Sequence, residues 1–184
     1  MTNPTPTPTL PSIGHAVRRA RSVFERKPEA ALHDDASATA RWQGGARVVT
    51  AHADGTQLST DLPVELGGSG DQVTPGWLFR AGLASCAATS IVLAAAADGV
   101  ELATLEVHVA SRSDARGLLG MRGADGRWVD AGPTDLQLQV RVRAAGVAVD
   151  RLRELVEQAL RCSPVPSLVR QATPLALRLE VVGA

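Results

Sequence analysis

Aromatic residues are scarce in this sequence, which has three Trp, two Phe and no Tyr among its 184 residues. The hydrophobic core must therefore be aliphatic and rich in Ala. Lys and Arg number 19, as do Asp and Glu, so the chain lacks the net charge that would indicate nucleic acid or an anionic membrane as a partner. With only two cysteines and no secretory signal, the sequence excludes a disulfide-rich exported scaffold and favours a cytoplasmic protein.

Familiar catalytic and ligand-binding signatures are also missing. The four histidines are scattered without ligand spacing, and no Walker, dinucleotide-binding, G-x-S-x-G, H-E-x-x-H or C-x-x-C pattern occurs in its required context. The sequence therefore predicts neither a metal ion nor an organic cofactor. Nucleotide-dependent and serine-hydrolase chemistry are disfavoured for the same reason.

Three segments are expected along the chain. The Thr/Pro alternation predicts a disordered lead over residues 1–11, because Pro fixes φ and removes amide donors. Residues 12–36 hold an N-terminal helix, Ile13 to Arg26, with a weak apolar face and several arginines, followed by a linker. Residues 37–184 are long enough to form one α+β domain with its own core.

A long central helix is the clearest element. Thr74 is a suitable N-cap, Pro75 suits the first helical position and Gly99 suits the far end. Residues 78–97 are apolar around nearly the whole circumference, yet Arg80 and the high Ala content favour a core helix over a membrane span. Such a helix should be enclosed on several sides, by sheet or by a second chain.

The remaining elements are predicted from alternation and turn signals. A hairpin is expected around Asp54-Gly55, and a second helix should be capped by Asp150 and ended by Pro164. The glycine-rich residues 112–133 predict a loop. Strands are expected over Thr39–His52, Thr56–Leu62, Thr104–Ser111 and Leu136–Val142, with a closing strand over Leu175–Val182.

Cys86, in the middle of the central helix, is the strongest candidate for chemistry. Buried cysteines are more often small hydrophobic residues than nucleophiles. Around Cys86, however, Ala and Ser leave room for a substrate, although the same small residues would also permit tight helix packing. A reactive thiolate this far along a helix needs a nearby cation. Arg80 is poorly aimed, which leaves Arg47 as the first candidate and Arg41 as the second.

Two motifs in this order resemble the OsmC family, which comprises osmotically inducible protein C and organic hydroperoxide resistance proteins. The first is the Gly67-Gly68 loop followed by TPGWLFRAGLASC, residues 74–86, and the second is CSPV, residues 162–165. The resemblance covers roughly Ala38 to the C-terminus. It implies an intertwined homodimer with long central helices packed against antiparallel-rich sheets and with active sites at the subunit interface.

The resemblance also implies a thiol-dependent peroxidase that reduces organic hydroperoxides. In active members a helix cysteine attacks the O–O bond, becomes a sulfenic acid and condenses with a second cysteine, and an external thiol then reduces the disulfide. Cys86 matches the attacking cysteine, and Cys162 is the candidate resolving cysteine. An arginine paired with a glutamate normally supports the thiolate.

This sequence departs from the family pattern at two positions. Gly76 stands where the glutamate usually follows the helix-opening proline, and Ser163 stands where the second cysteine usually precedes Pro-Val. Glu65 is a candidate replacement for the missing carboxylate. The alternative interpretation is a catalytically weak or inactive OsmC-fold protein that binds a small hydrophobic or electrophilic molecule.

Overall fold

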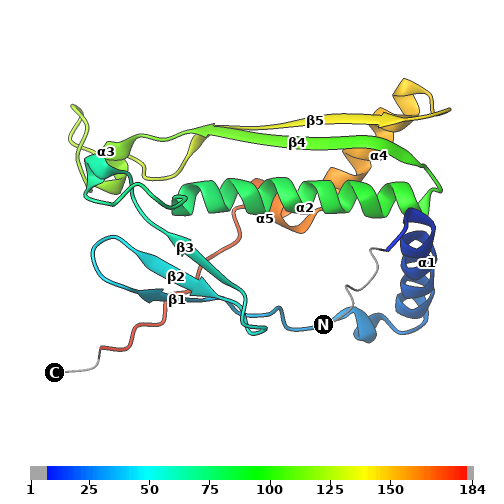
Figure 1. Cartoon of the computed structure of the whole chain (residues 1–184), viewed down its shortest axis with the longest axis horizontal. Helices are drawn as coiled ribbons and strands as arrows, with labels where there is room; N and C mark the ends of the chain where they lie inside the picture. Colours follow the sequence, from blue (N-terminus) through cyan, green and yellow to red (C-terminus); the bar gives the residue numbers. More distant parts are fainter. Residues whose placement is uncertain (1–7, 182–184) are drawn as a thin grey trace.

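The computed structural model describes residues 8–181 and is an α+β structure with antiparallel sheets, as predicted (Figure 1). In chain order its elements are α1 (Leu10–Arg26), η1 (Pro28–Ala31), β1 (Thr39–Trp42), β2 (Val48–Ala51), β3 (Gln57–Thr60), η2 (Val64–Leu66), α2 (Pro75–Ala97), β4 (Leu102–Arg112), α3 (Ala115–Leu118), β5 (Thr134–Ala144), α4 (Val149–Arg161) and α5 (Pro164–Gln171).

The limits of α2 agree with the sequence prediction. The side chain of Thr74 accepts a hydrogen bond from the amide of Trp77, and Pro75 occupies the first helical position, where no amide donor is needed. At the far end Gly99 adopts a φ of +68°, a left-handed conformation that glycine tolerates best. These signals lie within a few residues of the two ends of the helix and mark its limits.

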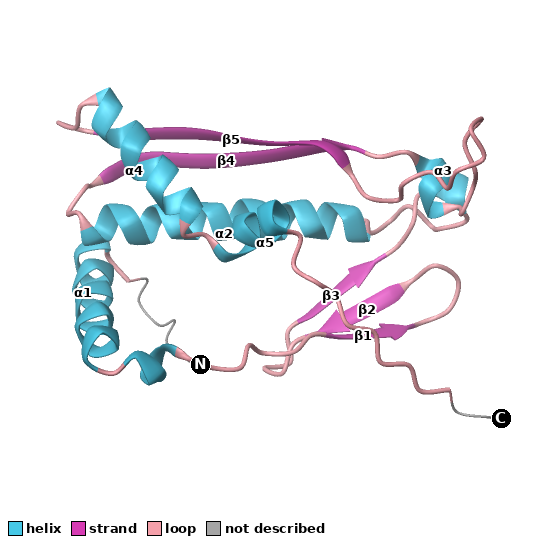
Figure 2. Cartoon of the chain, turned by 180° about the vertical axis from the view of Figure 1, so that it is seen from behind, coloured by secondary structure: helices cyan, strands magenta, loops and turns pink. Residues whose placement is uncertain are grey.

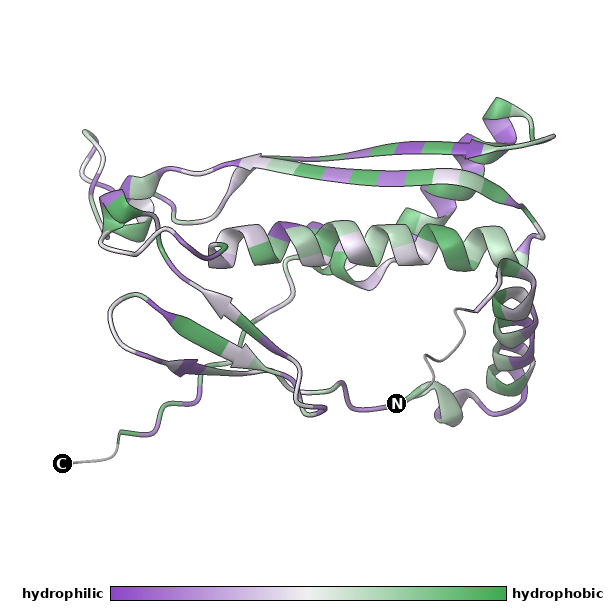
Figure 3. Cartoon of the chain, viewed as in Figure 1, coloured by the Kyte–Doolittle hydropathy of each residue, from purple (hydrophilic) through white to green (hydrophobic). Residues whose placement is uncertain are grey.

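The main core lies between α2, the long β4–β5 hairpin and α4 (Figure 2). Ile91 and Ala95 of α2 pack against Leu155 and Ala159 of α4, and all four side chains are buried. Along β4 and β5 hydrophobic and hydrophilic residues alternate (Figure 3), so one face of the hairpin supplies half-buried aliphatic side chains to this core. Alanine on α2 and α4 lets the helices approach closely.

The N-terminal sheet contains three strands rather than the predicted two. Residues 39–52 do not form one strand, because the chain reverses between Trp42 and Val48 at Gly44 and Gly45, which both have positive φ. The predicted turn at Asp54-Gly55 is present, and Gly55 has a φ of +93°. The strands follow the antiparallel order β1-β2-β3 and stand to one side of α2 in Figure 1.

Helix α1 packs against the C-terminal end of α2. It begins at Leu10, with Thr9 as N-cap, so residues 10 and 11 of the predicted disordered lead are helical, while residues 1–7 of that lead lie outside the described residues. Gly14 is buried against the backbone of α2, since a Cβ there would overlap the carbonyl oxygen of Ala96. Glycine at this position is what allows the two helices to touch.

Two predictions near the C-terminus are wrong. Ala148, not Asp150, is the N-cap of α4, and the carboxylate of Asp150 instead pairs with Arg153. The helix α4 does end before Pro164, as predicted, and Pro164 then opens another helix, α5. The predicted closing strand is absent from the part of the chain that is described, where residues 173–181 have no strand partner.

A considerable part of α2 remains uncovered in the single chain. Only 22% of its most apolar window is buried, and Trp77 and Leu93 are exposed. By length and hydropathy alone α2 qualifies as a membrane-crossing helix, a test that core helices of globular domains also meet. The predicted enclosure on several sides is therefore only partly achieved within one chain.

Candidate active site

Cys86 is half-buried in the middle of α2 and faces the start of α5. Its Sγ lies 3.4 Å from the Oγ of Ser163 and accepts a hydrogen bond from the amide of Val165, also at 3.4 Å. Ser163 is completely buried, so its hydroxyl has no competing solvent. The cysteine that the sequence singled out is thus held in a specific polar contact rather than packed only against hydrocarbon.

In the first turn of α5, a single backbone amide is available as a donor, and it points at the sulfur of Cys86. Pro164 and Pro166 occupy the first and third helical positions and have no N–H group, so Val165 is the one amide donor among these three residues. Ser163 is the N-cap residue, yet its side chain does not cap the helix. The sulfur of Cys86 takes the place of the usual capping oxygen, where the helix dipole favours negative charge.

Cys162 does not share this contact. It is the exposed C-cap residue of α4, and it lines a surface pocket with residues of α1 and α2, including Val17, Arg21 and Ser90. Leu155 and Ala159 line the same pocket, so Cys162 lies on the apolar side of α4, as its spacing predicts. Its role as resolving cysteine stays a prediction, and the residue that faces Cys86 is Ser163.

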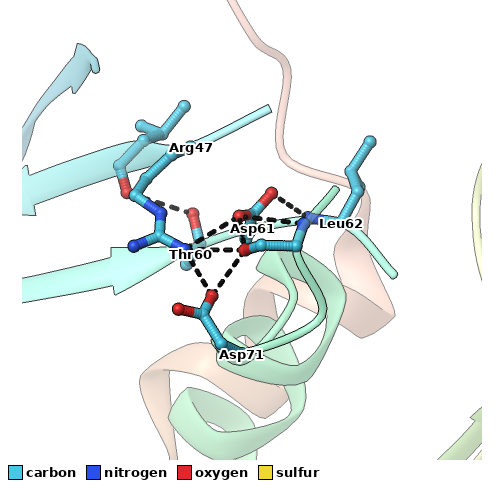
Figure 4. A network of polar contacts seen from close by, with 7 residues as sticks. Arg47, Thr60, Asp61, Leu62 and Asp71 are labelled. Carbon is cyan, nitrogen blue, oxygen red and sulfur yellow. Dashed lines mark hydrogen bonds and ion pairs between the residues drawn. The ribbon is translucent and has the colours of Figure 1, made fainter. Parts of the chain in front are cut away.

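Arg47 is engaged elsewhere. Its Nη2 donates to Asp61 at 3.2 Å, to Ser69 at 2.7 Å and to Asp71, which ties the start of β2 to the loop that leads into α2 (Figure 4). Asp61 is buried and also accepts hydrogen bonds from the amide of Leu62 and the hydroxyl of Ser69. We call Arg47, Asp61, Ser69 and Asp71 the Arg47 cluster.

The electrostatics of the Arg47 cluster match its geometry. The hydrogen bond from Arg47 lowers the pKa of Asp71 to about 2, with a further contribution from Ser69. The pKa of Asp61 is lowered chiefly by hydrogen bonds from Ser69 and from the amide of Leu62. Both carboxylates in turn raise the pKa of Arg47. The charge of this arginine is therefore compensated within the cluster.

Gly68 shows why the loop carries the Gly67-Gly68 pair. A Cβ at Gly68 would overlap the carbonyl oxygen of Leu62 and would lie 2.8 Å from a carboxylate oxygen of Asp61. The neighbouring Gly67 has a φ of +83° and ends the η2 turn. Both glycines thus serve the close approach of the loop to Asp61.

The other candidate charges do not contact the sulfur. Arg80 donates from Nη1 to Ser111 of β4 at 3.3 Å, and a Cβ built on Gly76 would lie 3.7 Å from the same Nη1. Arg41 and Glu65 are exposed, on β1 and η2 respectively. Within residues 8–181 no cluster of three His, Cys, Asp or Glu side chains has the arrangement of a metal site.

The family model described as OsmC-like protein matches residues 68–178, well over half of the chain. The chain belongs to the OsmC-like protein family. This OsmC-like chain is similar in fold to an OsmC-like protein from Mycoplasma pneumoniae, with a TM-score of 0.62 at 15% identity over 76% of this chain and 89% of that one.

Two further solved structures share the fold. An OsmC-like protein of unknown function from Vibrio cholerae gives a TM-score of 0.59 at 14% identity, covering 73% of this chain and 93% of that one. An organic hydroperoxide resistance protein from Elizabethkingia anophelis gives 0.52 at 20% identity, covering 76% and 90%. No curated protein sequence matches the chain.

Sequence reasoning missed the carboxylates of the Arg47 cluster and the role of α5. Asp61 and Asp71 flank the glycine-rich loop, so their position beside a tight turn was a usable signal. The Pro-Val-Pro run at residues 164–166 was another, because two prolines that begin a helix leave a single amide between them. Neither signal predicts which residue these groups contact, because Arg47 and Cys86 lie in other parts of the sequence.

Proposed function

We propose that this OsmC-like protein is a thiol-dependent peroxidase that reduces organic hydroperoxides through Cys86. The observation that carries the proposal is the contact of Sγ with the Val165 amide and the Ser163 hydroxyl, because both groups stabilise negative charge on sulfur by hydrogen bonding. A mostly apolar surface pocket of about 230 Å³ lies close to this site, although Cys86 itself does not line it. Its lining includes Leu83, one helical turn before Cys86, and Pro166, which follows Val165.

The proposed reaction begins with the thiolate of Cys86. Its sulfur attacks the terminal oxygen of the hydroperoxide, the O–O bond breaks and the alkoxide leaves, to be protonated to the alcohol. Sulfur is thereby oxidised to sulfenic acid and the peroxide is reduced. Two equivalents of a thiol return the cysteine to its reduced state and release water and a disulfide.

The test is peroxide consumption by wild-type protein and Cys86→Ser with cumene hydroperoxide and a thiol reductant. Wild type is expected to consume peroxide, whereas Cys86→Ser is expected to lose all protein-dependent consumption, because the serine hydroxyl does not reduce an O–O bond. Ser85→Ala, at an exposed neighbouring position, is the matched control and should retain activity. Equal rates in wild type and Cys86→Ser would contradict the proposal and favour the ligand-binding alternative.

We also propose that the working unit is a homodimer. The uncovered face of α2 and the strongly exposed Leu175, Leu177 and Leu179 leave apolar surface in contact with water, and large exposed apolar patches mark interaction surfaces. In residues 173–181 hydrophobic side chains alternate with polar ones, the pattern of a strand that still lacks a partner. A second copy of this chain would supply that partner and cover α2.

Sedimentation at micromolar concentration is expected to give about twice the 19.2 kDa chain mass. A chain ending at Ala172 should sediment as a monomer or aggregate, because it lacks the alternating segment. A full-length monomer would contradict the dimer. We place the protein in the cytoplasm, where thiols that reduce oxidised cysteine are abundant.

A further inference from the structure

We infer that oxidised Cys86 is resolved by an external thiol rather than by a second cysteine of the chain. This inference rests on the proposed peroxidase function and specifies its second substrate. The starting observation is that the position facing the sulfur is occupied by Ser163, at 3.4 Å and completely buried. A serine hydroxyl has no sulfur with which to form a disulfide, so the residue that faces Cys86 cannot resolve its oxidised form.

Cys162 is poorly placed to substitute for it. Its thiol is exposed at the C-cap of α4, and its backbone amide is committed to the last carbonyls of that helix, those of Gln158 and Ala159. A disulfide requires Cα atoms about 4.4–6.8 Å apart and Cβ atoms directed toward each other. The side chain of the next residue, Ser163, contacts Cys86, whereas Cys162 lines a surface pocket beside Ser90 and Ala159.

That junction is anchored on both sides. The Ser163 carbonyl accepts the first helical hydrogen bond of α5, from the amide of Ser167 at 2.9 Å, and Pro164 fixes the backbone between the two helices. The Arg170 side chain also bonds the Leu160 carbonyl of α4 at 2.7 Å. A movement of the backbone that brought Cys162 to the position of Ser163 would break these hydrogen bonds.

The resulting cycle needs only one protein thiol. The sulfenic acid of Cys86 reacts with one monothiol, an S–S bond forms and water leaves, giving a mixed disulfide. A second monothiol attacks the sulfur derived from the first, releases the Cys86 thiol and departs as a small disulfide. The Ser163 hydroxyl acts as a positioning residue that holds the sulfur and its oxidised form by hydrogen bonding.

The experiment compares wild type, Cys162→Ser and the double variant Cys162→Ser/Ser163→Cys. Each protein receives one equivalent of cumene hydroperoxide, followed by N-acetylcysteine, and its peptides are examined by mass spectrometry with dimedone as the sulfenic acid probe. Wild type and Cys162→Ser should both show dimedone labelling and a mixed disulfide at Cys86, with equal turnover. The double variant should lose the labelling because it forms an 86–163 disulfide.

A second arm oxidises the same proteins with diamide, which needs no peroxidase activity. The 86–163 disulfide should form in the double variant, and no 86–162 disulfide should form in wild type. An 86–162 disulfide in wild type, loss of turnover in Cys162→Ser, or absence of the 86–163 disulfide would overturn the inference. If hydroperoxide leaves Cys86 unoxidised in every protein while the diamide result holds, the peroxidase function fails and the assignment of Ser163 as the facing residue stands.

Discussion

The sulfur of Cys86 and the guanidinium of Arg47 were expected to belong to one site, and the structure gives them opposite surroundings. Arg47 is surrounded by two carboxylates and a hydroxyl, which together compensate its charge. Cys86 meets a neutral hydroxyl and a backbone amide. One region uses full charges to fix a loop, and the other uses dipoles to hold a sulfur. The comparison shows that Cys86 is held by a hydroxyl and an amide, and that the arginine predicted beside it belongs to another cluster.

The largest loss of stability is expected from Gly68→Ala, which adds a methyl group to the loop beside the Arg47 cluster. The new methyl would overlap the carbonyl oxygen of Leu62, so the loop must move and the hydrogen bonds to Asp61 must weaken. We expect a loss of about 3 kcal/mol in unfolding free energy, measured by urea denaturation. Gly132→Ala is the control and should be nearly neutral, because its nearest neighbour is an Asp130 side-chain oxygen 3.3 Å away. Similar losses in both variants would contradict the close-approach argument.

Acid should weaken the Arg47 cluster. The folded state lowers the pKa of Asp71 to about 2 from 3.8 and also lowers that of Asp61. A lowered folded-state pKa contributes stability that is present above the unfolded pKa and is lost as pH falls through the folded one. Thermal stability should therefore drop between about pH 4 and pH 2.

The pH dependence of thermal stability should also be measured for Arg47→Leu and compared with that of wild type. The variant should be less stable at neutral pH and should lose less stability on acidification, since Asp71 no longer has its cation. Asp114 supplies an internal reference, because Arg116 lowers its pKa in both proteins. Parallel pH profiles for wild type and Arg47→Leu would show that the cluster contributes no pH dependence.

At the sulfur site, Ser163→Ala tests whether neutral donors are enough. Removing one hydrogen bond of about 1 kcal/mol should slow alkylation of Cys86 and peroxide reduction about fivefold at neutral pH. Ser167→Ala, on the same helix, removes a hydroxyl that donates to Arg161 rather than to Cys86 and should leave both rates unchanged. Rates in Ser163→Ala equal to those of wild type would assign the support to Val165 alone.

The smallest effect is expected from Gly76→Glu, which restores the carboxylate of the family pattern. The new side chain would start close to Arg80, four residues on, and such a pair is worth about 0.3–0.5 kcal/mol on a helix. Because Arg80 donates to Ser111, we expect only a modest rise in peroxide reduction. A rise larger than the fall in Ser163→Ala would show that the added charge affects the rate more than the Ser163 hydroxyl does.

Local signals in the sequence were sufficient for α2 and for the central parts of strands β4 and β5, but not for their pairing. The N-cap, the proline and the final glycine of α2 act within a few residues of one another, and strand alternation depends only on neighbouring positions. The first sheet was partly missed because a turn at Gly44-Gly45 was taken for the interior of a strand. The predicted C-terminal strand is absent from the described residues, because alternation indicates which side chains share a face but does not provide a neighbouring strand to pair with.

The sequence by itself determined the central helix, the cysteine at its middle and the family to which the chain belongs. Only the tertiary structure decided which groups meet that cysteine. The direction of Ser163 and Val165 toward Cys86 depends on a change of helix between α4 and α5, and the pairing of Arg47 with Asp61 and Asp71 depends on a loop folding back on β3. Contacts between distant segments arise from packing, whereas periodicity and motif spacing record only what lies along one element.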